Sequence, residues 1–465
     1  MTKQRFSLLL LSLPLVLNSW GQTAGPSPEA AQAGAAPPGC PMTLDSLFAI
    51  ADRNSQQLRI SMTGAASSGE ALKAAKSNML PDVNLSLSGS YIGTATVLSR
   101  GFSSSGQTTV PYAIGVGQVQ NGPQPTPHWG NDFVAQVSQV IYAGGGIKAG
   151  IRMAELGEQM ALLDVEKNRQ EVRFLIVGHY LELCKLSNER EVVAGNIELT
   201  EQLLTTMRAR QEQGMMLKTD ITRYELQLQS LRLSEIQLRD AMSIMNHRIV
   251  TLLHLPEATE IVPAQTLSVV DGMEHQQWQD IASSQNIAIQ QARLASEISE
   301  AEVKAVRAKQ LPSVALIAED HLGGPYVNDL IPVNANINAW FIGIGIKYDL
   351  GSLWRGNHDV RRAHLNARQS IEKVALAREG INQAVQADYT NWRTSYVEVE
   401  TQRKQVELAT QHYDVTQNRY NNGLALLTDM LDASNMKLSA DMHLVNAQIN
   451  LIYNYYKLKF DTSSL

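Results

Sequence analysis

Long apolar runs are missing from most of this sequence of 465 residues. After Leu17, no stretch approaches the roughly 18 consecutive apolar residues that a transmembrane helix needs. Any passage through a membrane would therefore have to use β-strands. Cysteine is also scarce, with only Cys40 and Cys184 present. No pattern supports a disulfide between them, and a buried thiol is the simplest interpretation of Cys184.

Dense charge and catalytic motifs are missing as well. The net charge is only −6 and no Lys/Arg cluster occurs, so we expect no nucleic-acid partner. A phosphate-binding glycine loop, a zinc-spaced Cys/His set and a nucleophile motif are all absent from the sequence. We therefore expect no enzyme activity, no cofactor and no metal site. Met215 and Met216 are adjacent and would suit a soft metal, but apolar contact with a partner explains them better.

Two long stretches contain no proline, from His128 to Leu255 and from Val333 onwards. Interior proline costs a helix about 3 kcal/mol, so such stretches permit very long helices. Apolar residues recur every seven positions in both, as in a coiled coil. In the second stretch the seam consists of Val385, Trp392, Val399, Val406, Tyr413 and Tyr420, and a new seam begins beyond Gly423. Each stretch predicts a hairpin of two long helices, turning at Gly214 and at Gly423.

The first residues are typical of an exported protein. Lys3 and Arg5 precede an apolar run that ends at Leu17, and small or polar residues follow, so residues 1–21 are predicted to be a signal peptide. Residues 22–42 are rich in Ala, Gly and Pro and are expected to be an extended linker. Cys40 lies too far from the apolar run to be a favoured lipidation site.

The remainder is a tandem duplication. Pro81 recurs as Pro312 after the same helical pattern, and Gly214 recurs as Gly423. We therefore expect a first repeat over residues 43–255, a connector over 256–276 and a second repeat over 277–465. A helix capped by Thr43 is expected to run to about Met79. The last residues, 461–465, leave the heptad pattern and are expected to fray.

Each repeat has two candidate strands between its Leu-Pro pair and a Tyr-Gly landmark. They run over about 83–91 and 133–142 in the first repeat and over 314–319 and 340–348 in the second; residues 98–128 and 320–336 are expected to be loops. Apolar residues alternate with small or polar ones, most clearly in the last strand. An ordinary soluble sheet explains this pattern, and so do lipid-facing strands with interfacial aromatics. The aromatics concerned are Tyr91, Tyr142, Trp340 and Tyr348.

Four strands cannot close a barrel that encloses water, since about eight strands only just fit side chains inside. Several chains would have to contribute. The heptad pattern alone is compatible with assemblies of different numbers of chains.

This organisation resembles the outer-membrane efflux protein family, the TolC-like channels that form the exit duct of multidrug pumps and type I secretion systems. The resemblance covers residues 43–460 and is most specific around the second turn, at Tyr420, Gly423, Asp429, Leu431, Asp432 and Ala433. It implies a mainly α fold with a transmembrane β-barrel, in which a homotrimer shares twelve strands. It also implies an outer-membrane location, a long helical tunnel in the periplasm, and as partners the outer-membrane lipid, a periplasmic adaptor and an inner-membrane pump.

The same resemblance assigns roles at the tips of the hairpins. Gly214 and Gly423 are expected at the adaptor-docking surface. Asp429, Asp432, Tyr420 and Asp220 are expected at a periplasmic gate, with the two aspartates of the second repeat forming acidic rings. The alternative role for Asp429 is to cap its own helix.

One departure concerns the closed gate. The best-known members of the family carry a basic residue two positions after the second glycine, joined to acidic partners of the neighbouring hairpin, where this chain has Ala425. Asp220 would need another cation, with Lys218 and Arg223 the nearest in sequence, and Tyr420 remains able to hydrogen-bond across the tip. The main alternative function is a periplasmic coiled-coil adaptor or scaffold, which also uses long helical hairpins.

Overall fold

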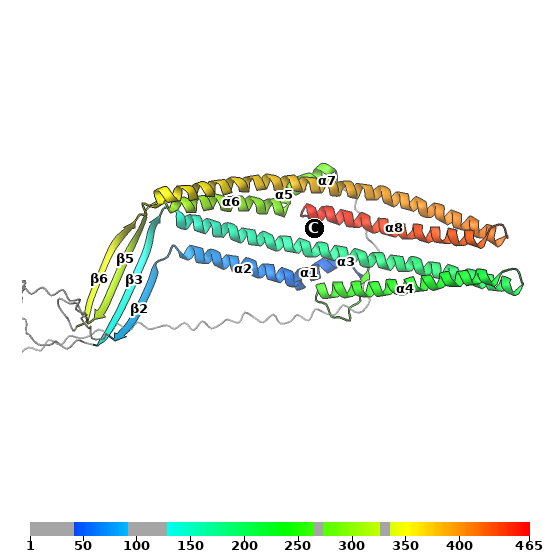
Figure 1. Ribbon diagram of the computed structural model, residues 1–465, viewed down its shortest axis with the longest axis horizontal. Helices are drawn as coiled ribbons and strands as arrows, with labels where there is room; N and C mark the ends of the chain where they lie inside the picture. Colours follow the sequence, from blue (N-terminus) through cyan, green and yellow to red (C-terminus); the bar gives the residue numbers. More distant parts are fainter. Residues whose placement is uncertain (1–40, 92–127, 265–272, 326–334) are drawn as a thin grey trace, which may run out of the picture.

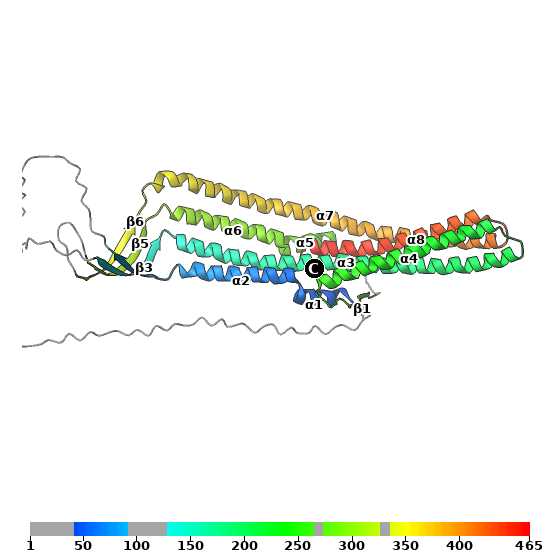
Figure 2. The same ribbon diagram turned by 60° about the horizontal axis from the view of Figure 1, so that its bottom comes forward.

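A computed structural model describes residues 41–91, 128–264, 273–325 and 335–465. The predicted signal peptide lies outside the described residues. Eight helices form an elongated bundle that carries a sheet at one end, with the tips of two helical hairpins at the other (Figures 1 and 2). The helices are α1 (Leu44–Asn54), α2 (Gln56–Ser77), α3 (Gly146–Glu212), α4 (Lys218–Leu252), α5 (His275–Gln285), α6 (Ile287–Ala308), α7 (Ser352–Asn421) and α8 (Leu427–Asp461).

The two predicted hairpins are present. Helices α3 and α7 contain 67 and 70 residues, which at 1.5 Å per residue makes each about 100 Å long. Each returning helix, α4 or α8, contains 35 residues and covers only the half of its partner nearest the tip. The other half is covered by α2 and α6, so the bundle keeps partners along its length (Figure 1).

The four predicted strands form one antiparallel sheet in the order β2-β3-β5-β6. Their bounds are β2 (Asp82–Tyr91), β3 (Trp129–Ala143), β5 (Ser313–Gly324) and β6 (Ile337–Lys347). Pairing of β3 with β5 joins the two repeats, with Val134 opposite His321. Residues 320–324, expected in a loop, instead continue β5 because β3 and β6 both extend alongside them.

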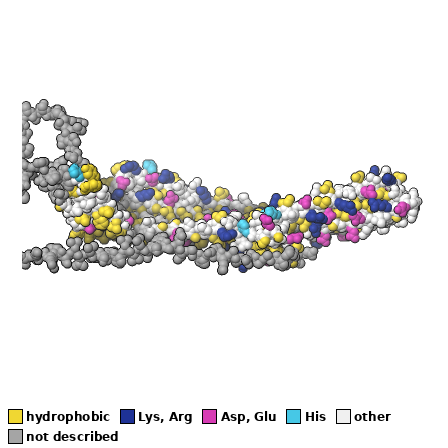
Figure 3. All heavy atoms as spheres, turned by 90° about the horizontal axis from the view of Figure 1, so that it is seen from below, with side chains coloured by type: hydrophobic (Ala, Val, Ile, Leu, Met, Phe, Trp, Pro, Cys, Tyr) yellow, Lys and Arg dark blue, Asp and Glu magenta, His cyan; other side chains and the backbone are white. Residues whose placement is uncertain are grey.

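One face of the sheet is apolar and exposed. Cross-strand partners point to the same face of a sheet, so the register determines which side chains share it. The apolar set comprises Val83, Leu85, Leu87, Leu316, Ile342, Ile344 and Ile346. In Figure 3, hydrophobic side chains gather over the sheet, whereas charged side chains are scattered over the helices. Among the described residues, no helix combines the length and the apolar character that crossing a membrane requires.

The expected helix from Thr43 to Met79 is interrupted, which corrects the sequence-based prediction. Thr43 does cap α1, accepting a hydrogen bond from the Ser46 amide at 3.3 Å. At Ser55, however, the chain leaves helical geometry and the Ser55 hydroxyl caps α2. The second repeat has the same break at Asn286 between α5 and α6. Serine and asparagine compete for backbone groups and favour caps, so both breaks have a local cause.

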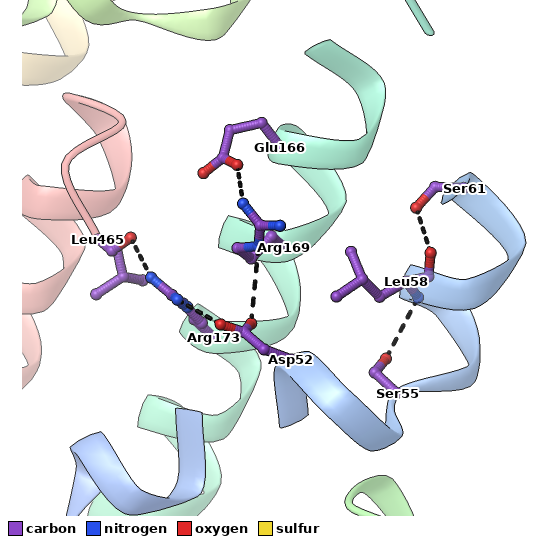
Figure 4. A network of polar contacts seen from close by, with 8 residues as sticks. All are labelled: Asp52, Ser55, Leu58, Ser61, Glu166, Arg169, Arg173 and Leu465. Atoms are coloured by element: carbon purple, nitrogen blue, oxygen red, sulfur yellow. Dashed lines mark hydrogen bonds and ion pairs between the residues drawn. The ribbon is translucent and has the colours of Figure 1, made fainter. Parts of the chain in front are cut away.

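The last residues do not fray, contrary to expectation. Thr462 is fully buried. Asn286 Nδ2 donates to the Asp461 carbonyl at 2.8 Å, and Gln170 of α3 donates to the Ser463 carbonyl at 3.0 Å. Figure 4 shows Arg173 between Asp52 and the Leu465 carbonyl oxygen, with Arg169 beside it. These contacts come from α1, α3 and α6, so heptad periodicity could not reveal them.

Two short strands, β1 (Pro41–Met42) and β4 (Val262–Pro263), pair in parallel beside α3. The buried Tyr180 hydroxyl joins them, donating to the Met42 carbonyl at 2.9 Å and accepting from the Ala264 amide at 3.1 Å. Burial is the main reason that the pKa of Tyr180 rises to about 12. Ordered structure thus includes the end of the predicted linker and part of the predicted connector.

Candidate functional site at the hairpin tips

Both tips turn on a glycine with positive φ. The φ angles are +73° at Gly214 and +72° at Gly423, a region that favours glycine. In each turn, an amide beyond the glycine bonds back to the end of the long helix, Met215 to the Arg210 carbonyl and Leu424 to the Arg419 carbonyl. This is the 6→1 bond of a glycine C-cap. A Cβ at either glycine would meet open space, so backbone geometry alone restricts the position.

An open cavity of about 730 Å³ lies between the two tips. Its lining comprises Arg210, Gly214, Met215, Met216, Leu217, Asp220, Tyr420, Asn421, Gly423, Ala425, Leu426 and Leu427. Four residues predicted from the sequence to act at the tips are therefore brought together: Gly214, Asp220, Tyr420 and Gly423. Asp429 and Asp432 do not line this cavity.

Arg210 supplies the cation between the tips, which the sequence analysis missed. Its Nη2 donates to the carbonyl and side-chain oxygens of Asn421 at 3.3 and 3.4 Å. Its guanidinium also lies 6.0 Å from the centre of the Tyr420 ring, within cation–π range. Arg210 lies in the last turn of α3, four residues before Gly214. That position was the available signal, although Lys218 and Arg223 lie nearer to Asp220 in the sequence.

Tyr420 is buried within the tip core together with Tyr224 and Tyr413. Burial raises the pKa of Tyr420, with Arg210 acting in the opposite direction and Asp220 in the same direction. Neither the Tyr420 nor the Tyr224 hydroxyl has a hydrogen-bond partner among the described residues. The expected hydrogen bond of Tyr420 across the tip is therefore not observed, and its ring makes the contact instead.

The three aspartates occupy different settings. Asp429 is exposed, and its Oδ2 accepts a hydrogen bond from the Leu426 amide at 3.0 Å, so it does cap α8. Asp432 follows one turn later and is also exposed. Among the described residues, no ion pair joins Asp220 to Lys218 or Arg223, the two cations expected for it. The alternative role foreseen for Asp429 is thus observed, and it is compatible with a second role.

The predicted interfacial aromatics lie toward the two ends of the sheet. Tyr91 stacks on His128 at 5.5 Å and packs edge-on against Trp129 at 5.3 Å, at the end away from the helices. Trp340 lies on β6 three residues from its start and is 71% exposed. Tyr142 and Tyr348 are at the helical end and are also exposed. Trp129 is likewise exposed beside Tyr91, and the sequence pattern did not include it because β3 begins earlier than that pattern indicated.

Solved structures define the class of protein to which this fold belongs. The outer membrane protein VceC of Vibrio cholerae matches with a TM-score of 0.72 and 16% identity, covering 90% of this chain and 96% of that one. The CmeC outer membrane channel of Campylobacter jejuni matches with a TM-score of 0.71 and 15% identity, covering 93% and 90%. The fold, with its paired hairpins and sheet, is that of outer-membrane channel proteins.

Sequence comparison finds similarity to one family, chiefly in the second repeat. Residues 278–459 match the outer membrane efflux protein family. The outer membrane protein TolC of Salmonella enteritidis is 22% identical over 189 residues, which are 40% of this chain and 38% of that protein. The chain thus spans about two fifths of the length of the curated relatives it matches. The TolC-like resemblance inferred from the sequence is confirmed, and with it an outer-membrane location extending into the periplasm.

Proposed function

We propose that the protein is a passive outer-membrane channel, the exit duct of a tripartite efflux pump or of a type I secretion system. The observation that carries the proposal is the exposed apolar face of the sheet, at the end of a helical bundle about 100 Å long. Exposure of such a face to water is unfavourable, whereas contact with lipid chains is favourable. Helices of this length would reach far across a periplasm toward an inner-membrane partner.

Three copies would complete the channel. Strands β2 and β6 are the two edges of the sheet, and each leaves one side of its backbone unpaired within the described part of the chain. Exposed edges of this kind invite pairing with another chain, and a closed barrel removes them. Three sheets of four strands would give twelve strands and an open lumen. The number three rests on the family resemblance.

The hairpin tips would form the periplasmic gate. The Arg210 contacts hold the two repeats of one protomer together where the family resemblance implies the pore closes. Asp429 and Asp432 are one turn apart on α8, so three protomers would present six carboxylates in two rings. Such rings attract cations and exclude anions at a constriction. Capping of α8 by Asp429 uses one carboxylate oxygen and leaves the charge in place.

The same tips would bind a periplasmic adaptor. Around the turns, Met215, Leu217, Leu424 and Leu426 are each at least 66% exposed, an unusual set of apolar side chains for a free end. Gly214 and Gly423 leave open space at the turns, which permits close approach of a partner backbone. An apolar surface beside two glycines suits a helical hairpin of another protein docking end to end.

The alternative of a periplasmic adaptor or scaffold accounts less well for the sheet. A soluble scaffold has no reason to expose a largely apolar face with five exposed aromatic side chains toward its ends, namely Tyr91, Trp129, Trp340, Tyr142 and Tyr348. The two proposals predict different behaviour when the protein is extracted from membranes. A scaffold should leave membranes in carbonate, whereas a channel should need detergent.

Single-channel recording tests the proposal. The detergent-purified protein should form stable conductances in a planar bilayer, and a divalent cation should block them from one side only. Asp429→Asn with Asp432→Asn should weaken this block and lower cation selectivity several-fold. Asp414→Asn with Glu398→Gln removes two charges from exposed positions on α7 and should leave both unchanged. Failure to insert, together with release in carbonate, would overturn the proposal in favour of the scaffold.

A further inference from the structure

The face of the sheet opposite the apolar one carries polar side chains. By the strand register its polar members include Asn84, Ser86, Ser88, Asp132, Gln136, Ser138, Glu319 and His321, and the apolar Val134 and Ile317 share the face. On β6, the small residues Ala339, Gly343 and Gly345 share this face with Ile337 and Phe341. In a barrel with lipid on the apolar side, this polar face lines the lumen.

Two residues of the polar face form a direct pair. His321 Nε2 contacts Asp132 Oδ1 within hydrogen-bond distance, linking β5 to β3. The two are diagonal neighbours rather than register partners, since Asp132 lies opposite Gly323 and His321 opposite Val134. The pair lies toward the end of the sheet away from the helices, near the start of β3 and the end of β5 (Figure 1).

Gly323 makes the pair possible. A Cβ at this position would come within 2.7 Å of Asp132 Oδ1 and 3.1 Å of His321 Nε2, closer than real side chains approach. Because no side chain stands between them, Asp132 can lean over Gly323 and reach His321. Both side chains stay accessible, with His321 34% and Asp132 48% exposed.

Few other charges face this pair. Glu319 is on the same face of β5, two residues from His321. The residues of β6 on this face beside His321 are Phe341, Ala339 and Ile337, which carry no charge. On β2, Asp132 lies opposite Ser88. Asp320 is on the apolar face, where it accepts a hydrogen bond from Asn338. In the described part of the sheet, Asp132 and Glu319 are thus the carboxylates that share this part of the polar face with His321.

We propose that the Asp132–His321 pair sets the ionic selectivity of the lumen as a function of the pH outside the cell. The inference rests on the proposed channel function and adds a second selectivity element, far from the hairpin tips. Histidine is the side chain whose charge changes between about pH 5 and 8. With His321 neutral the pair carries one negative charge per protomer, and with His321 protonated it carries none. Acidification therefore removes the attraction for cations at the outer end of the lumen.

Reversal potentials across a salt gradient test this inference. For the intact protein, lowering the pH from 8 to 5.5 on the loop side alone should reduce the cation-to-anion permeability ratio by about twofold, the effect of one charge acting across about 10 Å of water. His321→Gln should keep the high ratio at both pH values. His321→Arg should give the low ratio at both. Misfolding cannot explain a permeability ratio that stays high in one variant of position 321 and low in the other.

Glu319→Gln serves as the matched control, because it removes a charge from the same strand and face but leaves the pair intact. It should lower the ratio at both pH values and keep the pH response. Stable channels whose response to pH persists in His321→Gln would overturn the inference and leave the channel function standing. Absence of channels in the unmodified protein would overturn the channel function and the inference with it.

Discussion

At the scale of single residues, Arg210 of the first repeat contacts Asn421 and the Tyr420 ring of the second repeat. Position 425, where the family resemblance leads us to expect a basic residue, is occupied by Ala425. We therefore propose that Arg210 supplies the cation that joins the two hairpins of one protomer.

Arg210→Ala should loosen the tips. Two hydrogen bonds of 3.3 and 3.4 Å and a cation–π contact at an exposed site are together worth about 1 kcal/mol. The equilibrium between closed and open tips should therefore shift about fivefold toward open, raising the mean conductance in planar bilayers. The control Arg223→Ala removes the same charge from an exposed position in the second turn of α4. Equal conductance changes in both variants would mean that Arg210 has no special role.

At the scale of elements, the end of α8 is tied to α7 by a cluster of three charged residues. Lys457 Nζ lies 2.6 Å from Asp461 Oδ2 and 3.4 Å from Asp388 Oδ2. Burial is the first reason that the pKa of Asp388 rises to about 7, and the hydrogen bond and charge of Asp461 add to it, outweighing Lys457. One ammonium thus serves two carboxylates in a half-buried position.

This cluster makes stability depend on pH. In the unfolded chain an aspartate has its ordinary pKa of about 3.9, so between that value and about 7 the folded state binds more protons. The free energy of unfolding should therefore fall as the pH rises from 4 to 7, as far as Asp388 determines it. Asp388→Asn should stabilise the protein by about 1 kcal/mol or more at pH 8 and have little effect at pH 5. Thermal unfolding followed by circular dichroism at both pH values measures this.

Asp359→Asn is the control for that measurement. Asp359 is on the same helix, but its side chain is 56% exposed and pairs with Arg362 at the surface. The Asp359→Asn substitution should change the free energy of unfolding little at either pH. A stabilisation by Asp388→Asn that is equal at pH 5 and pH 8 would contradict the proposed titration.

At the scale of the whole molecule, the proposed assembly rests on the sheet. In the described part of the chain its apolar face is exposed and its two edge strands each have one unpaired side, and contact with lipid and with other copies would cover both. We expect the detergent-extracted protein to have the mass of three chains. Ile344→Lys places a charge on the apolar face, which costs about 2–4 kcal/mol near the middle of a bilayer. It should reduce the amount of trimer in the outer-membrane fraction, measured by native electrophoresis.

Gly343→Lys provides the matched comparison, one residue away on the opposite face. A Cβ at Gly343 meets nothing within 4 Å, so the new side chain has room. Trimer should form at nearly the normal level. If both lysine variants assembled equally well, the assignment of the apolar face to lipid would be wrong.

The sequence by itself determined the elements. Proline-free heptads predicted both hairpins, Gly214 and Gly423 predicted their turns, and alternating residues predicted four strands, because each of these signals is local and periodic. The family resemblance came from the duplicated organisation and from residues 420–433, which lie close together in the sequence. Even the alternative role of Asp429, capping α8, was visible from its distance to the glycine.

Only the tertiary structure decided what depends on contacts between distant segments. The pairing of β3 with β5, the anchoring of residues 461–465 by Asn286 and Arg173, and the reach of Arg210 to Asn421 all join residues more than 100 positions apart. Periodicity records which face of an element is apolar, but it does not record which element covers that face. The Asp132–His321 pair belongs to the same group, since it exists because Gly323 leaves space between two strands.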